Sequence, residues 1–595
     1  MTMDAAANPL ALAREARTNG DFLAAYDIAM TAKAEGLSHP KLDYFAALAL
    51  ADMGETERAA ELYASEGLAD EPDSDIRALN GRLKKELAQR SPGETQARLF
   101  AESSQAYHAL YDETHAYFPG VNAATMALLA GQEADARSLA REILAHPEIA
   151  DPDDYYAFVT AAEAHIILDD GPAALAAMQK ISGLSGIQAG QRVSTLRQMH
   201  LIQHIVPARQ VAIAPLLGLL RPAPVLYYSG HMFVEDEAVE ARLAADIAAA
   251  FDEIRPEFAY GALACGADIM IAEEALKRGC ELNLVFPFDI DDFIAQSVVP
   301  GGQGWLDRFH RCREQAKRES FATDSEYIGD PKLFTYGSHI AMGLARMRAR
   351  HLHTEAVQLA VLQQDSERKA AGTLRDVEKW QSFGQRVRIV DPGAIDRNLH
   401  RPPDITVPAE VSRGAYSLIF ADFAGFSSLN ESVLPLFNLT VLGRMGRVLD
   451  AHADKILYRN SWGDALYAVI TEPEYAASIA LELQQRLGDM PQELLDCAGP
   501  NCGMRVGVHH GPIYRAFDAV MQRESFFGTE VTRTARIEPV TPTGEVYVTE
   551  AFAAMLAVQS EQPFVCQYVG QVQLAKGYGA LAMYKLDRRG DVLEG

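Results

Sequence analysis

The chain shows three successive patterns of apolar and polar positions. From residue 8 to about 215, alanine and larger apolar residues recur at helical spacing in short segments separated by glycine turns, which predicts antiparallel pairs of helices. From Pro222, apolar runs such as VLYYSG and ELNLVFPF alternate with amphipathic helical segments, which predicts a parallel α/β sheet. Beyond about residue 413, strand and helix patterns follow in a mixed order. We therefore expect a multidomain protein.

Small residues mark the expected helix contacts in the first region, residues 1–215. In AALALADMGETERAAELYASEGL, Gly54 falls in a turn and the alanines let two helices approach closely. YHALYDETHAYFPGVNAATMALLAG predicts a turn at Pro119–Gly120 and then a helix, and residues 153–182 predict a further pair. The region resembles a tetratricopeptide-repeat (TPR) solenoid, and YFPGVNAATMALLAG resembles a "TRAFs-binding" helical region. Such a solenoid is either a plain scaffold or a concave surface for a protein partner.

Glycines follow the predicted strands of the second region, residues 222–395. Gly230, Gly261 and Gly266 lie where backbone N–H groups at a helix N-terminus can meet a phosphate, although tight packing alone also explains glycine there. The region resembles the Rossmann-like SLOG sensors of nucleotide ligands, which implies a nucleotide-like effector. The PGGQG segment at 300–304 is expected to be an ordinary turn. Residues 396–412 carry three prolines and no apolar periodicity, so they are expected to form a linker.

Two acidic residues follow apolar strands in the third region. SLIFADFAGFSSL runs into Asp422 and then a small-residue turn, where an acid beside exposed amides could hold a cation next to a polyphosphate. ILYRNSWGDALYAVI predicts two strands joined through Trp462, Gly463 and Asp464. Either feature alone is ordinary strand-end or turn chemistry.

The order of four motifs in this region is more specific evidence than either acidic residue alone. ADFAGF, SWGDALYAV, MRVGVHHG and FGTEVTRTARI follow one another at the spacing of a class III nucleotidyl cyclase catalytic domain, which residues 413–590 resemble. The resemblance implies an α+β ferredoxin-like fold and a homodimer with two shared sites. It assigns metal binding to Asp422 and Asp464, each site holding two Mg²⁺ or Mn²⁺ ions. It further assigns phosphate or transition-state contacts to the amides of Phe423, Ala424, Gly425, Phe426 and Ser427, and to Arg505 and Arg536.

Several positions depart from the family pattern. Asn460 and Ser525 stand at the base-reading positions, where the family has Lys or Glu and Asp or Cys. Thr532 stands where the family usually has a ribose-orienting Asn, and Lys576 lies near the family's phosphate-binding Lys, although the best register puts Tyr578 there. Because Asn and Ser both donate and accept hydrogen bonds, they impose no single base.

The amino-acid composition excludes some classes of binding partner. The 595 residues include 54 Lys and Arg against 81 Asp and Glu, a net charge of −27, which argues against nucleic acid and anionic membranes as partners. The longest apolar stretch, about ten residues at 211–220, is too short to span a membrane, and the N-terminal sequence is not that of a secretory signal. The six cysteines show no metal-binding spacing. We expect a cytoplasmic protein.

The leading hypothesis is a regulated cyclase that forms a 3′,5′-cyclic nucleotide and pyrophosphate. ATP is the first choice of substrate, with UTP, CTP and GTP left open. The alternative hypothesis is a catalytically silent scaffold that only binds a nucleotide.

Overall fold

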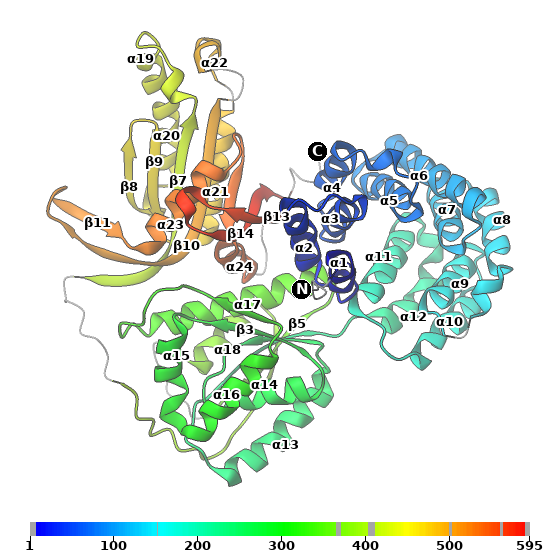
Figure 1. Cartoon of the computed structure of the whole chain (residues 1–595), viewed down its shortest axis with the longest axis horizontal. Coiled ribbons are helices and arrows are strands. Elements are labelled where there is room, and N and C mark those ends of the chain that lie inside the picture. Colours follow the sequence, from blue (N-terminus) through cyan, green and yellow to red (C-terminus); the bar gives the residue numbers. More distant parts are fainter. Residues whose placement is uncertain are drawn as a thin grey trace, which may run out of the picture. The chain divides into compact units, whose positions relative to one another are not determined.

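The computed structural model describes residues 8–151, 153–363, 371–402, 411–488, 490–498, 502–559 and 563–589. These residues form two compact units, each described here by itself (Figure 1). The first runs through Pro222 and includes His351–Thr354, and the second comprises Ala223–Arg350 and the chain from Glu355 onward.

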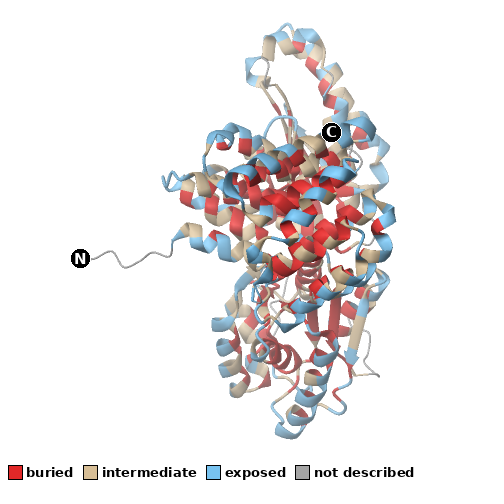
Figure 2. Cartoon of the chain, turned by 90° about the vertical axis from the view of Figure 1, so that its right-hand side faces the viewer, coloured by how far each residue is buried: buried red, intermediate tan, exposed pale blue. Residues whose placement is uncertain are grey.

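The first unit is a stack of helices in which each packs against its neighbours in sequence. Figure 2 faces this stack and shows buried residues gathered in its middle. The helices are α1 (Pro9–Thr18), α2 (Phe22–Ala34), α3 (Pro40–Asp52), α4 (Thr56–Ser65), α5 (Ser74–Arg90), α6 (Gly93–Thr114), α7 (Tyr117–Leu129), α8 (Glu133–Leu144), α9 (Tyr155–Ile167), α10 (Gly171–Gln179), α11 (Ala189–Ile205) and α12 (Gln210–Leu220). The predicted TPR-like helical region is confirmed.

One turn predicted in this unit is wrong. Pro119 and Gly120 lie inside the first turn of α7, not between helices. A proline is tolerated there because the first N–H groups of a helix have no intrahelical partner. A Cβ at Gly120 would lie 2.3 Å from Cδ1 of Ile143 in α8, so the glycine permits close packing of two helices. Every residue from Pro119 to Leu129 is buried.

The second unit begins with a parallel six-stranded sheet in the order β4-β3-β2-β1-β5-β6, which we call the middle domain. Its strands are β1 (Val225–Gly230), β2 (Phe258–Gly261), β3 (Glu281–Phe286), β4 (Arg318–Phe321), β5 (Ala356–Val361) and β6 (Arg386–Val390). The helices between and around them are α13 (Glu237–Ile254), α14 (Ala267–Lys277), α15 (Ile290–Ser297), α16 (Gln303–Gln315), α17 (Lys332–His351) and α18 (Thr373–Ser382). The strand order reverses between β1 and β5, the usual place for a ligand in such sheets. The predicted parallel sheet is confirmed.

The second unit continues with a mixed sheet in the order β13-β14-β12-β10-β7-β9-β8, with β11 paired to β10. The strands are β7 (Ser412–Ala424), β8 (Ile456–Trp462), β9 (Ala465–Ile470), β10 (Gly503–Asp518), β11 (Arg523–Phe527), β12 (Val546–Thr549), β13 (Phe564–Gln573) and β14 (Ala580–Arg588). Its helices are α19 (Leu434–Phe437), α20 (Gly443–Ala451), α21 (Pro473–Leu487), α22 (Gln492–Ala498), α23 (Thr529–Ile537) and α24 (Glu550–Ala557). The long central strands β7 and β10 pair antiparallel and position the residues of the candidate site.

No helix in the described ranges is both long and apolar enough to cross a bilayer.

Candidate functional site

Two central strands bring an acid and a base together. In the antiparallel register of β7 and β10, Asp422 lies directly opposite Arg505. Nη2 of Arg505 donates to Oδ2 of Asp422 at 2.7 Å and lies 2.8 Å from Oε1 of Glu538, just beyond the end of α23. Nε of Arg505 is buried and has no hydrogen-bond partner among the described residues. One guanidinium therefore serves two carboxylates and keeps a free donor.

A third carboxylate reaches this cluster from the β8–β9 hairpin. Asp464 lies in the predicted turn, close enough to Asp422 for the two carboxylates to interact electrostatically. Burial, and then the negative charge of Asp422, raise the pKa of Asp464 to about 6. Burial, and then the charges of Asp422 and Asp464, raise the pKa of Glu538 to about 7, although Arg505 opposes this rise. The cluster holds more negative charge than its single cation balances.

The turn after Asp422 has free backbone donors. Gly425 has φ +97°, and a short 3₁₀ turn, Phe426–Ser428, begins next to it. The first N–H groups of such a turn have no intrahelical acceptor, so they can point at a ligand. The side chain of Phe423 is buried and packs edge-on against Phe437, with ring centroids 5.2 Å apart. Of the five predicted phosphate-contacting residues, 423–427, Phe423 therefore has a side chain that is not available to a ligand.

The residues predicted to act on the α-phosphate and ribose lie elsewhere in the chain. Thr532 is exposed and Arg536 is half-buried on α23. Helical residues two apart point in nearly opposite directions, so Arg536 faces away from Glu538 and its carboxylate neighbours. Within the described ranges, Arg536 makes no hydrogen bond or ion pair. A single chain thus assembles Asp422, Asp464 and Arg505 but leaves Arg536 apart from them.

The predicted base-reading residues lie on β8 and β11, beside a residue that the sequence did not single out. Nη2 of Arg523 lies 3.4 Å from Oδ1 of Asn460 and 3.4 Å from the hydroxyl of Tyr458, and its guanidinium lies 5.1 Å from the centroid of the Tyr458 ring. Arg523 and Ser525 are two apart on one strand, so their side chains share a face. An arginine next to a hairpin turn looks like an ordinary solvated residue, and only the folded structure shows that Arg523 lies beside Asn460.

The loop between β13 and β14 lies next to α23. Leu574 packs with Ile537 of α23 in one buried cluster. Lys576 adopts φ +62° in the turn that follows and has no hydrogen-bond or ion-pair partner in the part of the chain that the structure describes. The short turn Ala575–Gly577 contacts α23, and Tyr578 directly follows this turn. Both residues proposed for the lysine position therefore lie near the helix that carries Arg536.

Glu538 is a further residue that sequence reasoning missed. It follows the FGTEVTRTARI motif by one position and looked like an ordinary helix-end acid. Its contact with Arg505 depends on the close approach of α23 to β10, where a Cβ at Gly507 would lie 2.9 Å from the backbone nitrogen of Glu538. A glycine inside the strand was the available signal.

Comparisons with known proteins identify two parts of the chain. A family model described as "Adenylate and Guanylate cyclase catalytic domain" matches residues 410–588. The C-terminal domain is a class III nucleotidyl cyclase catalytic domain. A second model, "Tetratricopeptide Repeats-Sensor", matches residues 21–127. No curated protein matches the chain.

Solved structures similar to the chain include the adenylyl cyclase CyaB from P. aeruginosa, at 18% identity and TM-score 0.27, covering 30% of this chain and 98% of that one. Another is the guanylate cyclase domain of RhGC from Catenaria anguillulae in complex with GTP, at 16% identity and TM-score 0.26, covering 30% and 99%.

The glycine turns of the middle domain are explained by packing. A Cβ at Gly230 would lie 2.3 Å from the Cβ of Ala267, and one at Gly261 would lie 2.6 Å from the ring of Tyr228. Gly266 has φ +92° and begins α14, a conformation that favours glycine. Of the two explanations that the sequence left open, tight packing is the one with direct support, and the resemblance to SLOG sensors stays a prediction.

In the PGGQG segment, Pro300–Gly302 form the predicted turn, and Gln303 and Gly304 begin α16. Gly302 and Gly304 crowd the carboxylate of Glu235, and the N–H of Trp305 donates to Oε1 of Glu235 at 3.0 Å. The chain's own carboxylate thus occupies the helix N-terminus where a phosphate would otherwise bind.

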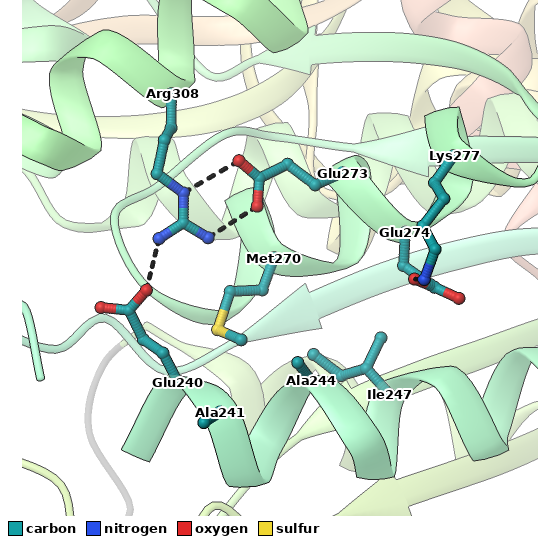
Figure 3. Close-up of a pocket in the computed structure, with 9 residues that line it drawn as sticks. All are labelled: Glu240, Ala241, Ala244, Ile247, Met270, Glu273, Glu274, Lys277 and Arg308. Atoms are coloured by element: carbon teal, nitrogen blue, oxygen red, sulfur yellow. Dashed lines mark hydrogen bonds and ion pairs between the residues drawn. The ribbon is translucent and has the colours of Figure 1, made fainter. Parts of the chain in front are cut away.

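A shallow pocket of about 360 Å³ lies among α13, α14 and α16 (Figure 3). In its wall, Arg308 donates two hydrogen bonds to Glu273 and one to Glu240, while Lys277 pairs with Glu274 at 2.9 Å. Because both cations are already paired with carboxylates of the pocket, it offers no free positive charge to a phosphate ligand.

Proposed function

We propose that the chain converts a nucleoside triphosphate to a 3′,5′-cyclic nucleotide and pyrophosphate in a homodimer with two shared sites. The observation that carries this proposal is the division of the site residues within one chain. Asp422, Asp464 and Arg505 form one group, whereas Arg536 lies apart and has no partner among the residues that the structure describes. A second copy that brings its Arg536 to this group would complete the site.

The acidic group fits divalent cations. Asp422 and Asp464 lie close together, and burial, followed by repulsion from Asp422, raises the pKa of Asp464 to about 6. Cations bound there would relieve this repulsion and would supply Lewis-acid activation of the ribose 3′-hydroxyl and charge neutralisation at the phosphates. We propose Mg²⁺ or Mn²⁺, two per site, with Asp422 and Asp464 as the protein ligands. No group of three His, Cys, Asp or Glu side chains in the described ranges is arranged to hold a metal, so the substrate would complete the coordination.

The chain's own residues would orient the triphosphate. The N–H groups at Gly425, Phe426 and Ser427 would donate to phosphate oxygens, and the unpartnered Nε of Arg505 would add a charged donor. From the other chain, Arg536 would donate to the α-phosphate, where charge accumulates in the transition state. In the same half-site, Thr532 would hold the ribose by its hydroxyl, and Lys576 would contact the phosphates.

We propose that Arg523, which lies beside Asn460, also contacts the base. The sequence favours ATP, and Asn460 and Ser525 both donate and accept hydrogen bonds. Arg523 only donates, and a guanidinium matches a pair of acceptors such as O6 and N7 of guanine. Guanine, uracil and cytosine carry carbonyl oxygens, whereas adenine carries none, so Arg523 gives GTP, UTP and CTP weight beside ATP.

The first experiment measures products. Purified protein is incubated with Mg²⁺ or Mn²⁺ and an equimolar mixture of ATP, GTP, CTP and UTP, and the products are identified by mass spectrometry. We expect one or two cyclic nucleotides and pyrophosphate. Arg523→Ala should change the ratio of products more than the total rate. Triphosphate binding without any product from an intact dimer would instead favour the silent scaffold.

The shared site is tested by mixing two inactive variants. Asp464→Ala and Arg536→Ala should each be inactive, since every site lacks one essential group. After mixing, heterodimers contain one complete site, so about a quarter of the wild-type activity should return if the chains exchange freely. No recovery in a mixture shown to contain heterodimers would contradict the division of the site between two chains.

We further propose that the N-terminal regions regulate this activity. A nucleotide-like effector of the middle domain and a protein partner of the helical stack are the expected inputs, with the protein acting in the cytoplasm.

A further inference from the structure

The middle domain and the cyclase domain contact each other directly within the second unit. The hydroxyl of Tyr336, in α17, donates to the carbonyl oxygen of His510 on β10 at 2.7 Å. A Cβ at Gly343 would lie only 2.1 Å from the carbonyl oxygen of Ala554, so α17 and α24 pass at closest backbone distance there. Because Tyr336 and the backbone around His510 are buried, this is a packed interface.

One loop of the middle domain reaches α23 at this interface. Oγ1 of Thr323, which is 1% exposed, donates to Oε1 of Glu530 at 2.6 Å. The carboxylate of Asp324 pairs with Arg533 at 2.7 Å. These contacts come from the segment 322–327 that follows β4, which we call the β4 loop.

Glu530 is a fully buried carboxylate whose oxygens are contacted from three sides. Besides Thr323, it receives a hydrogen bond from Nη1 of Arg533 at 2.8 Å, and its Oε2 lies 3.0 Å from Nε2 of His509 on β10. A buried charge without partners is strongly unfavourable, so α23 keeps this position only while its partners stay in place. Thr323 is the partner that the cyclase domain does not supply.

The same helix carries proposed site residues on its other side. Glu530, Arg533, Thr534 and Ile537 follow helical spacing and form the face that packs inward. Thr532 lies about 200° around the helix from Glu530, and Arg536 lies about 120° away, so both point out of this face. A shift or rotation of α23 would therefore move Arg536.

The β4 loop is also tied to the rest of the middle domain. The N–H of Tyr327 donates to Oδ2 of Asp292 in α15 at 2.7 Å, and the Tyr327 ring stacks on Phe288 with centroids 4.8 Å apart. The loop follows the carboxyl end of β4, the edge at which parallel sheets bind ligands. A change at that edge would reach α23 through the loop.

We propose that the β4 loop of the middle domain is a positioning element for the cyclase, which holds α23 through Thr323 and Asp324 and thereby sets the position of Arg536. The catalytic part of this inference rests on the proposed function. Thr323 and Asp324 are positioning residues, because they act on the reaction only through α23.

Contact between the loop and α23 can be tested without catalysis. Oγ of Ser325 and Oγ1 of Thr529 lie 3.4 Å apart, so Ser325→Cys with Thr529→Cys places two thiols within reach of a disulfide. We expect the double variant to form an intramolecular disulfide on mild oxidation, seen as a cross-linked peptide in the monomer-sized band. The two single variants control for the native cysteines. A folded double variant that forms no such disulfide would overturn the proposed contact.

Positioning is tested with a matched pair of interface variants. Thr323→Val removes one hydroxyl with little change of volume and acts on α23, whereas Glu550→Gln weakens the ion pair with Arg318, at 2.8 Å, that holds α24. We expect Thr323→Val to lower kcat about tenfold and to leave KM within about twofold, because the α-phosphate contact acts in the transition state. Glu550→Gln should leave kcat within about twofold. Equal effects of the two variants on kcat would overturn the positioning role.

Hydrogen exchange separates this inference from the proposed reaction. Amide exchange in residues 529–537 should accelerate in Thr323→Val and not in Glu550→Gln, whether or not any nucleotide is cyclised. The wild-type protein could fail to cyclise any nucleotide while exchange still accelerates in Thr323→Val and not in Glu550→Gln. In that case the proposed reaction fails and the contact stands. Unchanged exchange in Thr323→Val would overturn the inference itself.

Discussion

Two carboxylate clusters in the cyclase domain, both touching β10, differ in their balance of charge. Asp422, Asp464 and Glu538 surround Arg505 near the start of the strand, and burial with mutual repulsion raises the pKa of Asp464 and Glu538. Glu530 lies against the middle of the strand and is fully buried. Burial by itself would raise the pKa of Glu530. The hydrogen bonds and charges of its partners outweigh burial and lower this pKa to about 2.

The difference separates a binding site from a structural contact. The first cluster is partly exposed and short of positive charge, which is costly unless a cation or another chain supplies it. In the second cluster, hydrogen-bonding partners from β10, α23 and the β4 loop already surround the carboxylate. A carboxylate whose oxygens already have hydrogen-bonding partners cannot bind a further ligand. Removing a negative charge should therefore leave stability unchanged or higher at the first cluster and lower it at the second.

The largest expected effect is on activity at the first cluster. Asp464→Asn removes a proposed metal ligand and should lower cyclic nucleotide formation by at least about a thousandfold, or ~4 kcal/mol of transition-state stabilisation. The same change removes a repulsive charge, so thermal unfolding without added metal should occur at the same or a higher temperature. Asp450→Asn, in an exposed ion pair with Arg459, is the control and should change neither. Activity that survives Asp464→Asn would contradict the assignment.

The next effect is on stability at the second cluster. Glu530→Gln leaves the largely buried Arg533 with only the exposed Asp324 as its counter-charge and should lower the free energy of unfolding by about 3 kcal/mol. The folded-state pKa of about 2 lies below the ordinary value of 4.5, so this contribution is present above about pH 4.5 and is lost as the pH falls toward 2. The free energies of unfolding of the wild type and of Glu530→Gln, measured against pH, should converge in that range. Glu524→Gln, in an exposed pair with Arg515, should cost less than about 1 kcal/mol.

Sequence reasoning found Asp422, Asp464 and Arg505 of the first cluster but missed Glu538 and the whole second cluster, for physical reasons. Asp422 and Asp464 stand at strand ends in motifs of fixed order, so a linear pattern was enough to identify them. Thr323 and Glu530 are 207 residues apart and meet only because two domains pack together. The sequence predicted the three kinds of fold. It also predicted a turn at Pro119–Gly120, since proline and glycine usually break helices. This prediction failed because both residues are allowed in the first turn of a buried helix.

Metal addition should affect only the first cluster. With Mg²⁺ or Mn²⁺ at about a hundred times its dissociation constant, binding to the folded state should add about 2.7 kcal/mol of stability. Thermal unfolding of the wild type should shift upward on metal addition, and that of Asp422→Asn should not. Thr323→Val, altered at the second cluster, serves as the matched control and should respond like the wild type. An equal shift in Asp422→Asn would place the metal elsewhere.

The smallest expected effect on stability lies at the exposed edge of the second cluster, where water reaches the side chains. The side chain of Asp324 is 69% exposed and that of its partner Arg533 is 13% exposed, so water screens the pair and Asp324→Asn should cost less than about 1 kcal/mol. Thr323→Val, at the buried hydrogen bond beside it, should cost more, about 1–3 kcal/mol, because Glu530 then loses a donor that water cannot replace. Urea unfolding of both variants gives the comparison. A larger loss for Asp324→Asn would mean that the exposed ion pair, and not the buried hydroxyl, holds the β4 loop to α23.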